Sequence, residues 1–449
     1  MERDPRRDLG PKILIHSPYA LGNPNESPNG VSNFITEIEP HLERKGCVVR
    51  LLGPNIAEGD VNAADVALGR RVRITRNKTS SETSVLLNKR LAKAVLLTIR
   101  PDIVVFHEPL AGHVAHPFIS AAKKEDGTLI PVFIGNFHAR VESLDRATRA
   151  SLWVGQRLKR VTFNRWGVPN GSTDGYINTV MGALDGKIAV SNATADFWNG
   201  IYPSEYEVIY NGINTDKLTP DGPRIEAWQD GKQTILFTGR HDERKGIEYL
   251  LEAYRLLSAT RRSGIKLKIT GEGKMTEKLK QIVREQNLLD VEFVGILSRE
   301  ELVKAYRTAD IFVSPATGGE GFGRTLAEAM ACGTLTIGSD IDGYREVLDY
   351  QPFAGMVEPR NPHGLAKQIA KFLDFPEEER QRLGQEAAEY TRRRFSWDVI
   401  ADQHVLYYER MLSEHGRPRS EDWPRKERKK KGSMPVSRVR VVFERLRHR

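Results

Sequence analysis

Cysteine is scarce in this 449-residue sequence, which contains only Cys47 and Cys332. Two cysteines so far apart do not suggest a disulfide framework or a zinc site, and they favour a reducing cytoplasm as the location. The sequence also lacks a run of 18 apolar residues, so no transmembrane helix is predicted. Residues 1–10 are charged and have no apolar segment, which is unlike a secretion signal.

An excess of charge is missing from most of the chain, although the net charge is +9. Residues 425–449 contain 11 lysines and arginines and two glutamates, so this tail carries the whole excess. The high isoelectric point therefore describes the tail and does not indicate a fold that binds nucleic acid. With 39% hydrophobic and 28% charged residues, the chain has the composition of a globular protein.

Short β-rich runs alternate with helical patterns along the chain. In the first half we predict strands at 13–15, 48–52, 103–106, 132–134 and 188–190, with helices at 31–45 and 81–99. The pattern restarts near residue 233, with strands at 235–237, 267–269, 291–294, 311–313 and 335–337. Strands that alternate with helices indicate parallel sheets covered on both faces, and the chain length favours two domains.

The predicted fold class is therefore α/β, with two Rossmann-like, doubly wound domains that face a central cleft. The stretch 212–232 is rich in proline and glycine and lacks periodicity, so we place the domain boundary there. Ligands of such sheets bind outside the carboxyl ends of the strands, where functional residues are expected. The predicted organisation is a first domain at 1–215, a second domain at 216–395, a crossover helix at 396–412 and a basic, flexible tail at 413–449.

The segment 318–333 carries the most informative motif, because it follows a predicted strand and opens a predicted helix. Glycines near a helix N-terminus let backbone N–H groups approach an anion. Glu320 lies in the loop and Glu328 in the second turn of the helix, and a carboxylate can accept two hydrogen bonds from sugar hydroxyls. In the alternative interpretation, the loop is a tight turn with Glu320 solvated and Glu328 paired to a lysine. The binding residues predicted here are Glu320, Gly321, Phe322, Gly323, Thr325 and Glu328.

A second motif, residues 237–246, ends a predicted strand just before another helix. Arg240 and Lys245 stand beside the helix N-terminus, where two cations can hold a diphosphate and stabilise the charge that develops as a glycosyl bond breaks. The alternative is a surface cluster in which these cations pair with neighbouring carboxylates. The next predicted strand runs into Gly271, which we add to the candidate binding residues.

Together, the two motifs resemble those of the large retaining glycosyltransferase family 4, whose signature is Glu-x7-Glu followed by Ala-Met-Ala-x-Gly. The resemblance covers residues 12–412. It implies a GT-B fold, a nucleotide-sugar donor, retention of anomeric configuration and no tightly bound cofactor. It also implies that Glu320 contacts the donor hexose, that Glu328 contacts the ribose, and that Arg240 and Lys245 hold the diphosphate.

The resemblance extends to the first half of the chain. His138 follows a predicted strand, and the family places a histidine like this near the reacting sugar, although a lone histidine is often structural. Gly30 matches the glycine of the first loop, which approaches the donor phosphates in the family. By this resemblance, the first domain is the acceptor domain and the second is the donor-binding domain. The catalytic candidates are His138, Arg240, Lys245 and Glu320.

Within the family, the sequence is similar to bacterial phosphatidylinositol mannosyltransferases through the stretches 106–109, 188–191, 211–214 and 318–320. This similarity favours GDP-mannose as the donor, with a UDP-sugar as the alternative. Leu110 and Ala139 stand at positions that help to read the acceptor head group in that branch and differ from it here. The acceptor is therefore left open between a lipid and a glycan, and no metal ion is assigned.

Two basic segments suggest contact with a membrane. Residues 149–168 contain five basic and no acidic residues among aromatic and aliphatic side chains, which suits an anionic membrane surface. The alternative is a core helix with solvated cations. Residues 425–449 form a solvated extension, a lipid anchor or an RNA-binding arm. We expect a cytoplasmic protein that is peripheral on the inner face of the membrane.

Two other functions are left open. One is a sugar-nucleotide epimerase of the same fold, and the other is a nucleic-acid-binding protein that uses the tail.

Overall fold

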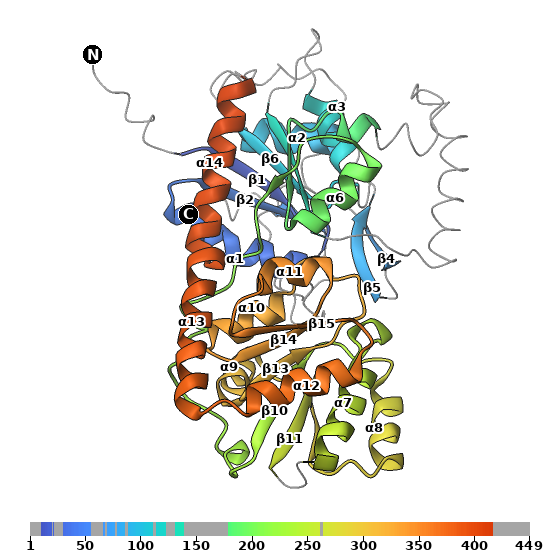
Figure 1. Cartoon of the computed structure of the whole chain (residues 1–449). Helices are drawn as coiled ribbons and strands as arrows, with labels where there is room; N and C mark the ends of the chain where they lie inside the picture. Colours follow the sequence, from blue (N-terminus) through green and yellow to red (C-terminus); the bar gives the residue numbers. More distant parts are fainter. Residues whose placement is uncertain are drawn as a thin grey trace, which may run out of the picture. The chain divides into compact units, whose positions relative to one another are not determined.

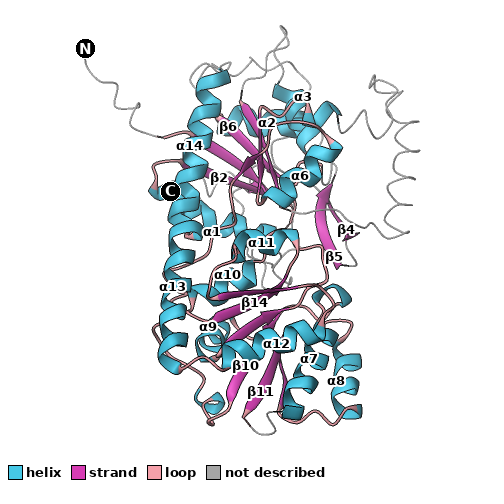
Figure 2. Cartoon of the chain, viewed as in Figure 1, coloured by secondary structure: helices cyan, strands magenta, loops and turns pink. Residues whose placement is uncertain are grey.

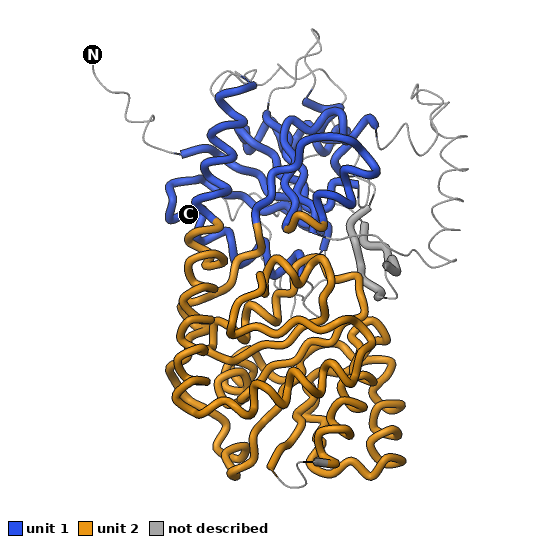
Figure 3. Tube along the Cα trace, in the orientation of Figure 1, with its two compact units in different colours: residues 1–190, 194–209, 401–449 blue, residues 191–193, 210–400 orange. Residues whose placement is uncertain are grey.

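The computed structural model describes residues 10–19, 21, 30–54, 66–67, 70–76, 79–85, 89–110, 114–122, 131–138, 178–260 and 264–415. The chain divides into two compact units (Figure 3). The N-terminal unit comprises residues 1–190, 194–209 and 401–449, and the C-terminal unit comprises residues 191–193 and 210–400. Among the described residues, none of the helices combines the length and the apolar character needed to cross a membrane.

The N-terminal unit is built on a seven-stranded parallel sheet with the order β3-β2-β1-β6-β7-β8-β9 (Figure 1). Its strands are β1 (Lys12–His16), β2 (Val48–Gly53), β3 (Val66–Ala67), β6 (Ile103–His107), β7 (Val132–Phe137), β8 (Gly186–Ala189) and β9 (Glu207–Val208). Its helices are α1 (Gly30–Arg44), α2 (Lys89–Ile99), α3 (Ala115–Ala122), most of α6 (Asn192–Ile201) and most of α14 (Trp397–His415). The central strands β6 and β7 are buried along their whole length, as expected for a sheet covered on both faces.

One predicted helix is wrong in its first part. The stretch 81–99 does not form a single helix, because β5 (Thr79–Val85) pairs antiparallel with β4 (Arg70–Arg76) and only Lys89–Ile99 is helical. The segment 79–85 is rich in threonine, serine and valine, and the β-branched side chains among them favour a strand over a helix. Cross-strand pairing with the preceding segment therefore outweighs the weak helical pattern.

The C-terminal unit contains a six-stranded parallel sheet with the order β12-β11-β10-β13-β14-β15. Figure 2 shows strands of this sheet, among them β10, β11 and β14, in magenta with helices in cyan around them. Its strands are β10 (Gln233–Thr238), β11 (Ile265–Thr270), β12 (Val291–Gly295), β13 (Ile311–Ser314), β14 (Leu335–Ser339) and β15 (Ala354–Val357). Its helices are α7 (Ile247–Thr260), α8 (Thr276–Glu285), α9 (Arg299–Thr308), α10 (Arg324–Ala331), α11 (Asp342–Leu348), α12 (Pro362–Leu373) and α13 (Glu377–Phe395). Helices α7 and α12 pack together, and α10 packs against α9 and α13, so the apolar strands are covered by helices.

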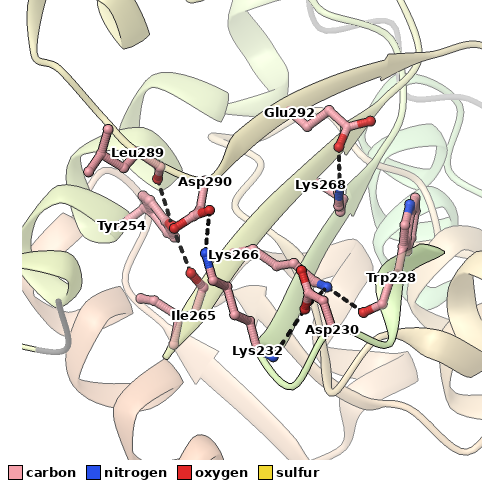
Figure 4. Close-up of polar contacts among 10 residues, drawn as sticks. All are labelled: Trp228, Asp230, Lys232, Tyr254, Ile265, Lys266, Lys268, Leu289, Asp290 and Glu292. Atoms are coloured by element: carbon pink, nitrogen blue, oxygen red, sulfur yellow. Dashed lines mark hydrogen bonds and ion pairs between the residues drawn. The ribbon is translucent and has the colours of Figure 1, made fainter. Parts of the chain in front are cut away.

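The amino ends of β10, β11 and β12 are joined by polar contacts (Figure 4). Lys266 is buried and pairs with Asp230 at 2.6 Å, and Lys232 pairs with Asp290 at 2.6 Å. The Tyr254 hydroxyl lies within hydrogen-bond distance of two carbonyl oxygens, 3.2 Å from the one that opens β11 and 3.0 Å from the one at residue 289. We call these five residues the amino-end cluster. They hold helix α7 and the segment that leads into β10 against the strands.

Helix α14 returns the chain to the N-terminal unit. From residue 401 onward it belongs to that unit, and the hydroxyl of Tyr407 accepts a hydrogen bond from the backbone N–H of Lys187 at 2.9 Å. An ion pair between Lys45 and Asp402, 2.7 Å long, adds a second contact. A segment more than 200 residues distant in sequence thereby covers part of the N-terminal sheet.

Both sheets reverse their strand order once, between β1 and β6 in the N-terminal unit and between β10 and β13 in the C-terminal unit. Each is therefore doubly wound, as the alternating pattern predicts. The crevice at such a reversal, beyond the carboxyl ends of the two strands, is where sheets of this kind bind ligands. The loops that follow these four strands are the places in which to look for function.

Candidate functional site

Two loops meet where the strand order of the C-terminal sheet reverses. One follows β10 and spans residues 239–246, and the other follows β13 and spans residues 315–323. The backbone N–H of Thr317 donates a hydrogen bond to the carbonyl of Arg244 at 2.8 Å, which holds the two loops together. The two sequence motifs, about 80 residues apart, are thus brought side by side at the switch point.

Glu320 is shared by two cations on these loops. Its Oε1 atom lies 2.8 Å from Lys245 Nζ and also accepts a short hydrogen bond from Arg244 Nη1. Its side chain is only 15% exposed. Burial opposes ionisation of this carboxyl, but the two cations outweigh burial and lower the pKa of Glu320 to about 2. We call Arg244, Lys245 and Glu320 the carboxyl-end cluster, and its carboxylate is ionised at neutral pH.

The loops that follow β10 and β11 are packed closely against each other. Gly271 has a φ of +98°, and a Cβ atom there would lie 2.1 Å from the carbonyl oxygen of Gly239. His241 fastens the same loops, because its Nδ1 lies 2.9 Å from Thr276 Oγ1 and its Nε2 lies 3.3 Å from the Thr270 carbonyl. Glycine is therefore required at 271 for the close approach of two backbones.

The N-terminus of helix α10 opens directly from the loop that carries Glu320. Gly323 occupies the N-cap position with a φ of +89°. Because glycine has no side chain, the N-cap residue itself makes no side-chain hydrogen bond to the helix. Thr325 lies half-buried in the first turn. The ring of Phe322 is buried against Tyr210 and Phe395, at centroid distances of 5.8 and 5.4 Å. The aromatic ring therefore anchors the loop, and the backbone around it is the part that can approach an anion.

Glu328 is buried in α10 and is held by three side chains. Its Oε2 accepts a hydrogen bond from the hydroxyl of Tyr306 at 3.2 Å. Its Oε1 lies 3.0 Å from Arg324 Nε and 3.2 Å from Arg299 Nη1. The partners among the described residues are thus arginines and a tyrosine, not the lysine that the alternative interpretation offered.

In the N-terminal unit, histidines gather at the carboxyl ends of the central strands. His16 ends β1, His107 ends β6 and His138 directly follows β7. The Nδ1 atom of His107 lies 2.7 Å from Nε2 of His138. The ring of Phe34, from α1, contacts both rings at centroid distances of 5.4 and 4.8 Å, and it also lies 5.8 Å from the ring of His404 in α14. We call these four histidines the histidine cluster.

Burial keeps most of this cluster neutral. It lowers the pKa of His16 and that of His404 to about 3. It also lowers the pKa of His107 well below its usual value, and charge on the other three histidines would lower it further. A buried imidazole without an opposite charge is disfavoured in its protonated form, so these three rings are uncharged at neutral pH.

The structure unites part of the predicted site and adds to it. Lys245 and Glu320 are in contact. Arg240 is exposed, and the arginine that binds Glu320 among the described residues is Arg244. Gly30 is the exposed first residue of α1. Sequence reasoning missed Arg244, although it directly precedes Lys245 in the same motif. It also missed His107. The signal that could have identified this residue is its position as a polar residue at the end of a buried strand.

No group of three or more histidine, cysteine, aspartate or glutamate residues is placed to hold a metal ion in the part of the chain that the structure describes. The sequence does contain an Asp-x-Asp spacing, at Asp340 and Asp342, but both carboxylates contact the guanidinium of Arg345, at 2.5 and 3.1 Å. The segments 149–168 and 425–449, predicted to contact a membrane, and Ala139 lie outside the described residues.

Two family models and a curated relative match most of the chain. Residues 220–390 match the family Glycosyl transferases group 1, and residues 28–217 match Glycosyltransferase Family 4. The phosphatidyl-myo-inositol mannosyltransferase of Mycobacterium leprae (strain TN) is 27% identical over 408 residues, which cover 89% of this chain and 96% of that protein. The chain is thus similar to this relative over almost the whole length of both.

Solved structures resemble the chain in their fold. A glycosyltransferase from Rickettsia africae ESF-5 superposes with a TM-score of 0.67 at 19% identity, covering 90% of this chain and 99% of that one. The Anabaena protein HepE, in complex with UDP and glucose, superposes with a TM-score of 0.62 at 16% identity, covering 89% of this chain and 100% of that one. At such identities, the likeness shows the fold alone.

Proposed function

Because this chain is a family 4 glycosyltransferase with the GT-B fold, and hence a hexosyltransferase, we propose that it transfers mannose from GDP-mannose to an acceptor hydroxyl with retention of configuration. The observation that carries the proposal is the carboxyl-end cluster at the switch point of the C-terminal sheet, where two cations share one buried carboxylate. Cations, a helix N-terminus and an acidic group at one edge suit a sugar that is linked to a diphosphate.

The cations and the carboxylate take different parts of the donor. A diphosphate brings about two negative charges, and more charge develops on it as the glycosyl bond breaks, so preorganised cations stabilise the transition state. We assign Lys245 and the exposed Arg240 to the diphosphate, with the backbone at Gly30, Gly271, Gly321 and Gly323 close to it. Glu320, held in place by Lys245 and Arg244, accepts hydrogen bonds from the hexose hydroxyls.

Glu328 is assigned to the ribose of the donor. A carboxylate offers about four lone-pair sites, and three of them are used by Tyr306, Arg324 and Arg299. One site on Oε2 is left for a ribose hydroxyl. Because the arginines fix the other oxygen, the carboxylate is oriented before the nucleotide arrives, which reduces the entropic cost of binding.

The choice of mannose and of the acceptor rests on the relatives. Phosphatidyl-myo-inositol mannosyltransferases that match nearly the whole chain favour mannose, and UDP with glucose in the HepE complex keeps a UDP-sugar as the second candidate. We propose a lipid or glycan hydroxyl as the acceptor. The basic segments 149–168 and 425–449 then bring the enzyme to an anionic membrane surface from the cytoplasm.

Retention follows from attack on the face from which the nucleotide leaves. In the proposed step, the bond between the anomeric carbon and the phosphate oxygen breaks while the acceptor oxygen bonds to the same face of that carbon. The acceptor proton passes to the departing phosphate, so the products are the glycoside and the nucleoside diphosphate. His138 acts next to the reacting sugar, and the chain's cations hold the charge of the departing diphosphate.

A donor hydrolysis screen tests this proposal. GDP-mannose, UDP-glucose and UDP-N-acetylglucosamine are incubated with the protein, and release of the nucleoside diphosphate is measured. GDP-mannose should be turned over fastest, and Glu320→Ala should reduce turnover by about 100-fold to 1000-fold while the fold is retained. The matched control is Glu292→Ala. Glu292 lies on the edge strand β12 and its carboxylate pairs with Lys268 of β11. Normal turnover by the Glu320 variant would refute the role assigned to this residue.

A further inference from the structure

The hydrogen bond between His107 and His138 gives His107 a role of its own. We propose that His107 is a positioning residue, which fixes the orientation and the tautomer of His138. The proposal rests on the function proposed above, in which His138 acts beside the reacting sugar. It is based on the 2.7 Å contact between His107 Nδ1 and His138 Nε2 and on the packing of both rings against Phe34.

The backbone on either side of this contact is fixed. The N–H of Glu108 donates a hydrogen bond to the carbonyl of Asn136 at 2.8 Å, and the N–H of His138 donates to Glu108 Oε1 at 3.1 Å. Glu108 has a φ of +52°, a conformation that is uncommon for a residue with a side chain and that persists only where its surroundings demand it. The carboxyl ends of β6 and β7 are therefore clamped, so the free variable at His138 is the rotation of its ring.

His107 controls that rotation and the position of the proton. A neutral imidazole carries one N–H and one acceptor nitrogen, so a hydrogen bond between two neutral rings requires one to donate and the other to accept. The buried ring of His107 stays neutral beside His16 and His404, so one of the two rings donates and the other accepts, and the tautomer of His138 is tied to that of His107. The other ring nitrogen of His138, Nδ1, does not face His107. Whether Nδ1 carries a proton or a lone pair depends on whether Nε2 accepts from His107 or donates to it.

The two remaining members of the cluster have different surroundings. His404 is fully buried, and neither of its ring nitrogens has a hydrogen-bond partner among the described residues. Its ring approaches Phe34, and no hydrogen bond joins it to His107 or His138 among the described residues. The structure therefore supplies a matched position, a buried histidine in the same cluster whose replacement leaves the 2.7 Å contact in place.

Two substitutions at His107 separate positioning from packing. The amide of asparagine reaches the place of Nδ1, whereas the amide of glutamine reaches the place of Nε2, one bond farther from the backbone. His107→Asn keeps a group that can bond to His138, and His107→Gln removes it while keeping a polar side chain of similar size. His404→Gln is the control for the loss of a buried imidazole.

We would measure GDP-mannose hydrolysis, GDP binding, and the tautomer of His138 from the nitrogen-15 shifts of its ring, using the full chain. His107→Gln should lower kcat by about 100-fold, the effect expected of a misplaced catalytic group, and leave the dissociation constant of GDP unchanged. In this variant the His138 ring should populate both tautomers. His107→Asn should restore most of kcat and a single tautomer, and His404→Gln should resemble the unsubstituted protein.

Equal kcat in the Asn and Gln variants, or an unchanged tautomer of His138 in His107→Gln, would overturn the proposal. The nitrogen-15 measurement needs no substrate, so it gives an answer even if none of the three donors is hydrolysed. That last result would count against the proposed function, whereas the tautomer result bears on His107 alone. Thermal melting of each variant confirms that it is folded when the shifts are recorded.

Discussion

The two ends of the C-terminal sheet both carry lysines paired with carboxylates, yet they differ in how many cations share one carboxylate. At the amino end, the Lys266 side chain is 4% exposed and its partner Asp230 is 50% exposed. At the carboxyl end, the side chains of Lys245 and Glu320 are 14% and 15% exposed, and Glu320 lies between Lys245 and Arg244. The first arrangement neutralises a buried cation, and the second holds a buried anion with more cations than it needs.

This difference separates a structural ion pair from a binding site. A lysine matched to a single carboxylate and a carbonyl, as Lys266 is with Asp230 and the carbonyl of Trp228, has little to gain from a further anion. A carboxylate shared by two cations leaves one of them able to turn toward a phosphate. Glycines such as Gly271 bring backbone close to this end of the sheet. Ion pairs therefore mark a site only when their stoichiometry and their surroundings allow a new partner.

The largest effect expected from this comparison is at Lys245. Lys245→Met should lower donor hydrolysis by about 100-fold to 1000-fold, because a preorganised cation that faces developing charge is removed. Lys232→Met is the matched control at the amino end, where the lysine pairs with Asp290 and should be worth at most about 1 kcal/mol of stability. Steady-state rates and melting temperatures of both variants check this. If the two substitutions reduced the rate equally, the distinction between the two ends would fail.

A smaller effect concerns the histidine cluster, a third site at the end of a sheet, where imidazole rings are buried. The pKa of His16 and that of His404 are lowered by burial to about 3, well below the value in an unfolded chain. Below the unfolded value near 6.5 the unfolded chain binds more protons, so stability falls as the pH falls, by about 1.4 kcal/mol per pH unit for each histidine.

Denaturant unfolding at pH 7 and pH 5 measures this loss. His404→Gln removes one of these buried histidines, so the stability lost between these pH values should be smaller than in the unsubstituted protein by about 2 kcal/mol. The matched control for the replacement of a histidine is the same substitution at His363, which lies exposed at the protein surface. An identical loss in His404→Gln and in the unsubstituted protein would show that His404 is not buried in its neutral form.

Much of the C-terminal unit could be predicted from the sequence, because its signals are local. Apolar runs separated by helical patterns predicted all of its strands except β15, and the motif around Glu320 and Lys245 predicted two side chains that the structure places in contact. The contact between Arg244 and Glu320 could not be predicted, since it depends on the short 3-10 helix Glu243–Lys245, which sets the directions of side chains within a few residues. Local order in a loop is not encoded by periodicity.

The histidine cluster shows the opposite case. His16, His107 and His138 each end or follow a parallel strand, so the rule that carboxyl ends share one edge would have grouped them. His404 comes from α14, more than 260 residues beyond His138, and reaches the cluster only because that helix packs on the N-terminal sheet. No pattern in the sequence links a histidine in a terminal helix to a strand end, and tertiary packing alone decides it.

The smallest effect is expected at the amino-end cluster, where Tyr254 tests whether this end is purely structural. Tyr254→Phe keeps the ring and removes the one hydroxyl proton that two backbone carbonyls share, which should lower the free energy of unfolding by about 1 to 2 kcal/mol. Tyr249→Phe, on the same helix α7, is the matched control and should change it by less than about 0.5 kcal/mol. Donor hydrolysis should stay at the level of the unsubstituted protein in both variants. The amino-end cluster and the carboxyl-end cluster are separated by the length of the strands, so the one should not influence the other. A fall in the rate for Tyr254→Phe, at a temperature where the protein is fully folded, would contradict this separation.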